Sequence, residues 1–151
     1  MLFRSWLEAM AAALGLAFDP PPLPDPAGEA GPDDLHAYVL DRLRDAVLPH
    51  VDDRLAQARV KDVARVVKHL DARARHGAAF DAAELDDLAA LLGARPATVA
   101  TGRAAVDAAA RTGAVGAEAY LRYRARRAAR ENELLRAASG VLADRHWPPL
   151  R

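Results

Sequence analysis

AQARVKDVARVVKHLDARA, residues 56–74, carries the clearest periodicity in the sequence. An apolar side chain recurs there at every third or fourth position, namely at Ala56, Val60, Val63, Val67, Leu70 and Ala74. This spacing places the apolar side chains on one face of an α-helix over about five turns. We expect the helix to cover residues 50–76 and to end at Gly77, because glycine is common just beyond the last helical residue.

The composition favours helices along the rest of the chain as well. Hydrophobic residues make up 52% of the 151 residues, alanine supplies much of that share, and aromatic residues account for only 5%. Alanine is the strongest helix former, and the β-branched and aromatic residues of sheets never alternate with polar residues over a useful length. We therefore expect an all-α fold, a four- to five-helix bundle that follows an N-terminal helix and a proline-rich spacer.

Proline separates the first helix from the rest of the chain. Residues 2–17 repeat apolar side chains at helical spacing, whereas the prolines of residues 19–32 exclude both a helix and a central strand. We divide the chain into a short helix at residues 1–18, a linker at residues 19–32 and a helical bundle domain at residues 33–151. The first five residues resemble a translated adapter sequence, which suggests that the short helix is the remnant of a preceding domain and docks weakly.

Capping residues predict the remaining helices of the bundle. Asp33 and Asp34 suit the start of a helix that Pro49 kinks or ends. Asp81 and Glu84 have the spacing of a capping box before a short helix that ends at Gly93. Pro96 suits the first position of the next helix. The expected ranges of the last three helices are 81–92, 97–111 and 117–144.

The sequence contains none of the complete motifs that identify catalytic, nucleotide or metal sites. It has no cysteine, and it lacks the glycine-rich phosphate loops, paired zinc-binding histidines and serine elbow of common enzyme classes. The G-x-x-G match at residues 113–116 is expected to be a loop between helices. We therefore predict no metal site, no cofactor and no identifiable catalytic residue, and we favour a protein that is not an enzyme.

The most charged stretch runs from Tyr120 to Arg136. Arg122, Arg126 and Arg130 recur every four residues and could present a ridge to phosphates, to an acidic partner or to a neighbouring helix. The chain as a whole has 21 basic and 21 acidic residues, so it lacks the positive field of a typical nucleic-acid binder. We expect acidic residues to neutralise the ridge, as Glu131 would neutralise Arg127.

Asn132 is the only asparagine in the chain, and it falls on the apolar stripe of the last helix. A buried amide needs hydrogen-bond partners, so Asn132 either fixes the packing of a neighbouring helix or lines a pocket. In the second case Tyr123 and Arg127 would share the pocket, and the protein would be a small-ligand binder or an enzyme.

Residues 45–49 (DAVLP), 54–56 (RLA) and 58–60 (ARV) give the chain a family likeness. Over residues 33–93 it resembles the uncharacterised helical domains that accompany aminoglycoside-phosphotransferase-like proteins. Those domains have no assigned chemistry, so the resemblance implies an accessory role and gives no catalytic residue.

Three functional hypotheses follow. The leading hypothesis is a non-catalytic accessory module, attached to or accompanying a phosphotransferase-like enzyme, that binds a protein partner or an adjacent domain through helical faces and could form an oligomer. The second is a ligand site near Asn132, and the third is anion or nucleic-acid binding by the arginines of residues 122–136. No stretch approaches the roughly 20 uncharged apolar residues of a membrane span, so we expect a cytoplasmic protein with no membrane contact.

Overall fold

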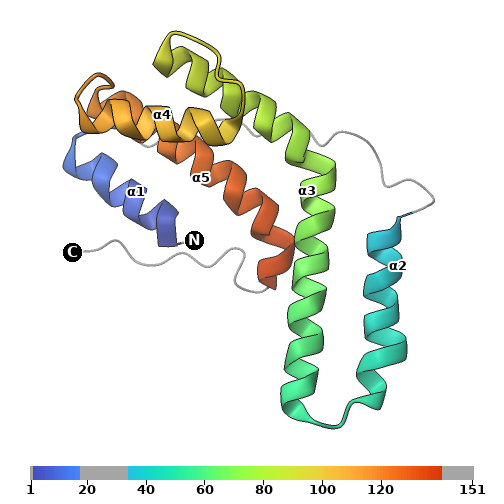
Figure 1. Ribbon diagram of the computed structural model, residues 1–151. Coiled ribbons are helices and arrows are strands. Elements are labelled where there is room, and N and C mark those ends of the chain that lie inside the picture. The colour runs from blue at the N-terminus through green and yellow to red at the C-terminus, as the bar shows by residue number, and fades with distance from the viewer. Residues whose placement is uncertain (1, 18–33, 141–151) are drawn as a thin grey trace. The chain divides into compact units, whose positions relative to one another are not determined.

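The computed structural model describes residues 2–17 and 34–140, and these residues are almost entirely helical (Figure 1). The elements are α1 (Leu2–Ala13), α2 (Leu35–Arg42), the π-helical turn η1 (Leu43–Val47), the 3-10 turn η2 (Leu48–His50), α3 (Arg54–Leu92), α4 (Val99–Arg111) and α5 (Ala117–Ser139). The described part contains no strand, and the all-α prediction is confirmed. The predicted linker at residues 19–32 lies outside the described residues, and so do residues 141–144 of the predicted last helix.

Contacts divide the described chain into two compact units. Unit 1 contains residues 2–17 and 78–132, and unit 2 contains residues 34–77 and 133–140. The first helix therefore shares a unit with later helices. Its origin in a preceding domain stays a prediction.

Unit 1 contains two clusters of buried apolar side chains. In the first, Leu7 and Ala11 of α1, each 2% exposed, join Leu121 and Ala128 of α5. Helix α1 therefore packs against α5 within this unit. The second cluster comprises Leu88, Val106, Val115 and Tyr123, which come from α3, α4, the following loop and α5.

Helix α3 runs without interruption through Gly77, so the predicted end at Gly77 and the separate helix over residues 81–92 are wrong. A single glycine inside a helix costs only about 1 kcal/mol relative to alanine. Gly77 is buried, and a Cβ atom placed on it would lie 2.9 Å from the Cδ atom of Arg73. The helix instead ends before Gly93, whose φ of 73° is the left-handed value expected of a glycine beyond a helix.

Side-chain caps account for two other helix starts. Asp34 caps α2 by accepting hydrogen bonds from the backbone N–H groups of His36 and Ala37, as the sequence predicted. Helix α4 begins later than expected, because Thr98 and Thr101 cap it reciprocally, and Pro96 precedes the cap rather than occupying the first helical position. The expected interruption at Pro49 is confirmed, since the helical path from α2 ends through η1 and η2.

Candidate functional site

Glu84 lies at the centre of a buried polar cluster in unit 1. It is 3% exposed, and its carboxylate accepts hydrogen bonds from Arg103 Nε at 2.6 Å and Nη2 at 2.7 Å and from the Tyr123 hydroxyl at 2.9 Å. Glu84 comes from α3, Arg103 from α4 and Tyr123 from α5, so the cluster joins three helices. Its first effect is therefore to fix how these helices pack.

The cluster shifts the protonation of its members in opposite directions. Burial by itself raises the pKa of Glu84, but the hydrogen bonds from Arg103 and Tyr123 outweigh it and hold that pKa below the ordinary value of 4.5. Burial, together with the neighbouring carboxylate of Glu84, raises the pKa of the Tyr123 hydroxyl. At neutral pH Tyr123 is therefore a hydrogen-bond donor to an ionised Glu84.

The arginines predicted to form a ridge are paired with acidic residues. Arg126 Nη1 and Arg130 Nη2 donate to the two carboxylate oxygens of Asp87 at 2.7 and 2.8 Å. Arg122 donates to Glu118 at 2.6 Å. These ion pairs neutralise the arginine charges that an anion or a nucleic acid would need to bind.

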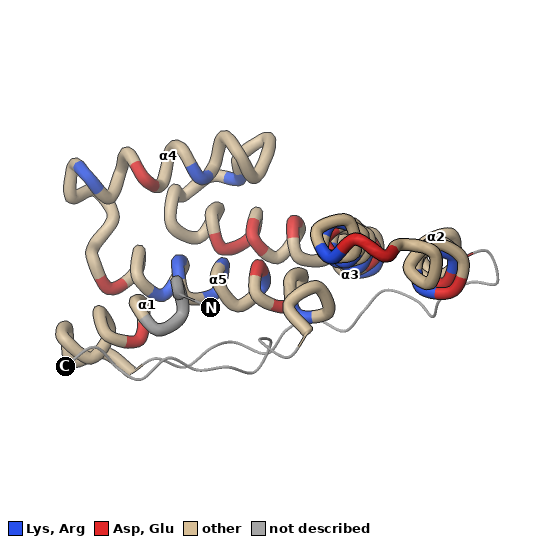
Figure 2. Tube along the Cα trace, turned by 90° about the horizontal axis from the view of Figure 1, so that it is seen from below, with Lys and Arg blue, Asp and Glu red and all other residues tan. Residues whose placement is uncertain are grey.

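Arg127 is also paired. Its Nε donates to Glu131 at 2.8 Å, as their spacing of four residues predicted. Figure 2 shows acidic positions on α3 and basic positions on α5, the two helices that Asp87 joins through Arg126 and Arg130. The expectation that acidic residues neutralise this stretch is confirmed for Arg122, Arg126, Arg127 and Arg130.

A pocket of about 550 Å³ opens beside the loop between α4 and α5. It is lined by Asp107, Ala110, Arg111, Gly113, Val115, Gly116, Ala117 and Tyr120. The predicted loop at residues 113–116 is confirmed and forms part of this lining. Asn132 is half-buried farther along α5 and, like Tyr123 and Arg127, does not line the pocket. The ligand site around Asn132 stays a prediction.

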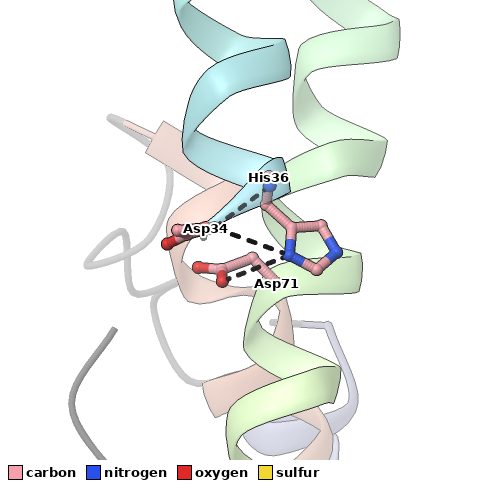
Figure 3. Close-up of side chains that lie close together, drawn as sticks. All are labelled: Asp34, His36 and Asp71. Atoms are coloured by element: carbon pink, nitrogen blue, oxygen red, sulfur yellow. Dashed lines mark hydrogen bonds and ion pairs between the residues drawn. The ribbon is translucent and has the colours of Figure 1, made fainter. Parts of the chain in front are cut away.

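Unit 2 brings together three side chains of metal-binding type (Figure 3). Atoms of Asp34, His36 and Asp71 that could each ligate an ion lie within 4.8 Å of one another. The Nδ1 atom of His36 is 3.7 Å from a carboxylate oxygen of Asp34 and 3.7 Å from one of Asp71. This cluster cannot be recognised from the sequence, because residues 34 and 71 meet only once α2 has folded against α3.

Arg75 already supplies a cation to this cluster. Its Nη2 donates to Asp34 at 2.6 Å and its Nε donates to Asp71 at 2.8 Å. The backbone N–H of Ala37, together with the charge of Arg75, holds the pKa of Asp34 below its usual value. We interpret the cluster as a polar latch between the start of α2 and the middle of α3, with a guanidinium in place of a metal ion.

Unit 2 also exposes large apolar side chains. They are Leu35, Tyr38, Val39, Val47, Leu55, Val63, Val66, Leu70 and Leu135, with exposed fractions from 38% to 72%. Val63 and Leu70 belong to the stripe of residues 56–74, but they are half exposed, whereas Val60 and Val67 are partly covered. The stripe therefore only partly faces the interior.

Five of these residues form one surface, which we call the hairpin face: Leu35 and Val39 on α2 with Val63, Val66 and Leu70 on α3. The latch turns His36 toward α3 and turns Asp71 and Arg75 toward α2. At about 100° per residue, Leu35, Val39, Val63 and Leu70 lie roughly a quarter turn before the side of their helix that faces the other helix. Val66 lies about 140° before Asp71, at the outer edge of the same surface. Helices α2 and α3 run side by side in opposite directions (Figure 1), so equal rotations place both apolar sets on the same side.

No family model, no curated protein and no solved structure matches this chain. None of the helices in residues 2–17 and 34–140 is long and apolar enough to cross a membrane. The link to phosphotransferase-associated domains stays a prediction that rests on the resemblance over residues 33–93.

Proposed function

We propose that this chain is a non-catalytic helical interaction module whose hairpin face binds an apolar surface of a protein partner. One observation carries the proposal: five large apolar side chains, 39% to 72% exposed, lie on one side of two antiparallel helices. Single exposed apolar residues are ordinary on protein surfaces, but a contiguous group of them marks an interaction site.

The arrangement of charges supports the same proposal. Four of the arginines that could bind an anion, Arg122, Arg126, Arg127 and Arg130, pair with Glu118, Asp87 or Glu131 inside unit 1. The buried Glu84 is held ionised by Arg103, which suits a structural role better than proton transfer near neutral pH. An accessory role beside a phosphotransferase-like enzyme is the narrower form of the proposal, and its support is the sequence resemblance.

Photo-crosslinking tests the proposal. A photoreactive amino acid is placed at Val66, on the hairpin face, and separately at Lys61, an exposed position on the opposite side of the same helix. We expect adducts from position 66 in cells of the native host, few from position 61, and loss of the position-66 adducts when Leu70→Asp is added. Equal yields at the two positions, or no adduct at either, would contradict the proposal.

A further inference from the structure

We infer that the partner of the hairpin face is a second copy of this chain, and that two α2–α3 hairpins pack face to face as an antiparallel four-helix bundle. This inference rests on the proposed function, because it names the occupant of the same surface. It starts from the fact that unit 2 has little interior of its own. Among the described residues of unit 2, Leu134 is the one buried hydrophobic residue, and α2 has none.

The α2–α3 hairpin is a single layer of two helices that buries only the seam between them, and the end of α5 adds Leu134, whose carbonyl lies 3.2 Å from Nδ1 of His69 on α3. Stable helical architectures close a second layer over the apolar side of the first. The occupant must therefore be an apolar surface about two helices wide and as long as α2. A second α2–α3 hairpin has that size, and its own hairpin face would be buried by the same contact.

The hairpin has two arms, residues 34–53 with α2 and residues 54–77 with the first part of α3. Their net charges favour this occupant and select one arrangement. Residues 34–53 hold five acidic and two basic residues, a net charge of −3. Residues 54–77 hold two acidic and seven basic residues, a net charge of +5. Opposite charges attract across an interface, and like charges that face each other are costly.

A two-fold axis parallel to the helices satisfies these charges. It places the acidic arm of each copy over the basic arm of the other, with every neighbouring pair of helices antiparallel. A two-fold axis across the helices would stack acidic on acidic and basic on basic.

The first arrangement also matches the apolar residues. The latch sets residues 34 and 36 level with residues 75 and 71. A rotation about an axis parallel to the helices keeps those levels. Leu35 and Val39 of one copy then lie over Leu70 and Val66 of the other, and the reciprocal contacts follow, as a two-fold interface requires.

Sedimentation equilibrium on the purified 151-residue chain tests the inference. We expect a dimer of twice 16.2 kDa. Its association should weaken as salt is added, because exposed charges are screened. Val66→Asp should weaken dimerisation by about tenfold or more, since it puts a charge into an apolar contact. The matched control is Ala37→Asp, because Ala37 is exposed and lies about 200° around α2 from both Leu35 and Val39, and it should leave dimerisation unchanged. Far-ultraviolet circular dichroism checks that both variants fold.

Engineered cysteines test the arrangement, because the chain has none of its own. Mixed Val39→Cys and Val66→Cys proteins should form a disulfide between the two variants, whereas Val66→Cys alone should crosslink poorly. Efficient self-crosslinking of Val66→Cys would overturn the arrangement with α2 over α3.

The outcome distinguishes this inference from the proposed function. A chain that stays monomeric at all concentrations would overturn the second copy as partner. The proposed function would survive if the photoreactive group at Val66 still captured a different protein with the expected face dependence. It would fall together with the inference if no face-dependent adduct formed.

Discussion

Glu84 and Arg130 are the two charged residues buried in the described part of the chain, and each depends on a specific partner. Arg103 makes two hydrogen bonds to the carboxylate of Glu84 with two of its nitrogens. Arg130 and Arg126 both pair with Asp87. A buried charge without a partner is strongly unfavourable, so these pairs tolerate few alternative packings. The polar contacts between α3 and its neighbours thus help to select one arrangement of unit 1.

Glu84→Gln tests that dependence. The amide can still accept a hydrogen bond but removes the buried charge that Arg103 faces, leaving Arg103 only its longer 3.4 Å ion pair with Glu131, and we expect the free energy of unfolding to fall by about 2 kcal/mol. Urea unfolding followed by circular dichroism measures it. The control is Glu118→Gln, which removes an exposed pair with Arg122 and should change the stability by less than about 0.5 kcal/mol. Equal effects of the two substitutions would contradict the structural role of Glu84.

Acid should weaken the same contact. The pKa of Glu84 in the folded protein lies below its ordinary value of 4.5, so the unfolded chain takes up a proton more readily than the folded chain. The stabilisation is complete above the ordinary value and is lost as the pH falls through the folded one. We therefore expect the difference in unfolding free energy between the wild type and Glu84→Gln to shrink below about pH 4.5. A difference that stayed constant down to pH 3 would contradict this assignment.

The sequence contained a signal for the burial of Glu84 that its capping-box spacing obscured. Phe80, Glu84 and Leu88 are spaced by four residues, which puts the carboxylate on the same buried face as two core residues. The pairing of Arg127 with Glu131 was predictable because both lie on one helix. The partners Arg103 and Asp87 were not, because they depend on which helices meet.

At the scale of elements, helical periodicity predicted where helices occur but not where they end. The apolar repeats of residues 56–74 and the caps at Asp34 and Gly93 act locally, so they could be identified from the sequence. Gly77 could not be judged in that way. Its neighbours on both sides favour a helix, and tertiary packing outweighs the modest propensity cost of one glycine.

Gly77→Ala tests the continuity of α3. The φ angle of Gly77 is not positive, and the added methyl group would lie 2.9 Å from Cδ and 3.0 Å from Nε of Arg73, an exposed side chain that can shift. We therefore expect the protein to become more stable, by about 0.5 kcal/mol at most. The matched control is Gly93→Ala, where a φ of 73° should make the same change destabilising by about 1 kcal/mol. Urea unfolding compares them. If both substitutions destabilised the protein equally, a helix that ends at Gly77 would be the better description.

At the scale of the whole molecule, the two units differ in how much interior they contain. Unit 1 buries two apolar clusters and the polar cluster around Glu84, whereas α2 contributes no buried residue to unit 2. No sequence pattern predicted this difference. The apolar spacing of residues 56–74 is the same whether the stripe meets another part of the chain or a partner.

Native-state hydrogen exchange should reveal the difference directly. Local opening is easiest where few apolar contacts must be broken, so we expect the amides of residues 38–42 in dilute protein to exchange faster than those of residues 84–92 and 121–130. If hairpins associate, raising the protein concentration should slow exchange in α2 while leaving residues 121–130 unchanged, because only the former gain contacts. Val66→Asp should abolish that concentration dependence. Equal protection of the two units in dilute protein would contradict the view that unit 2 depends on a partner for its interior.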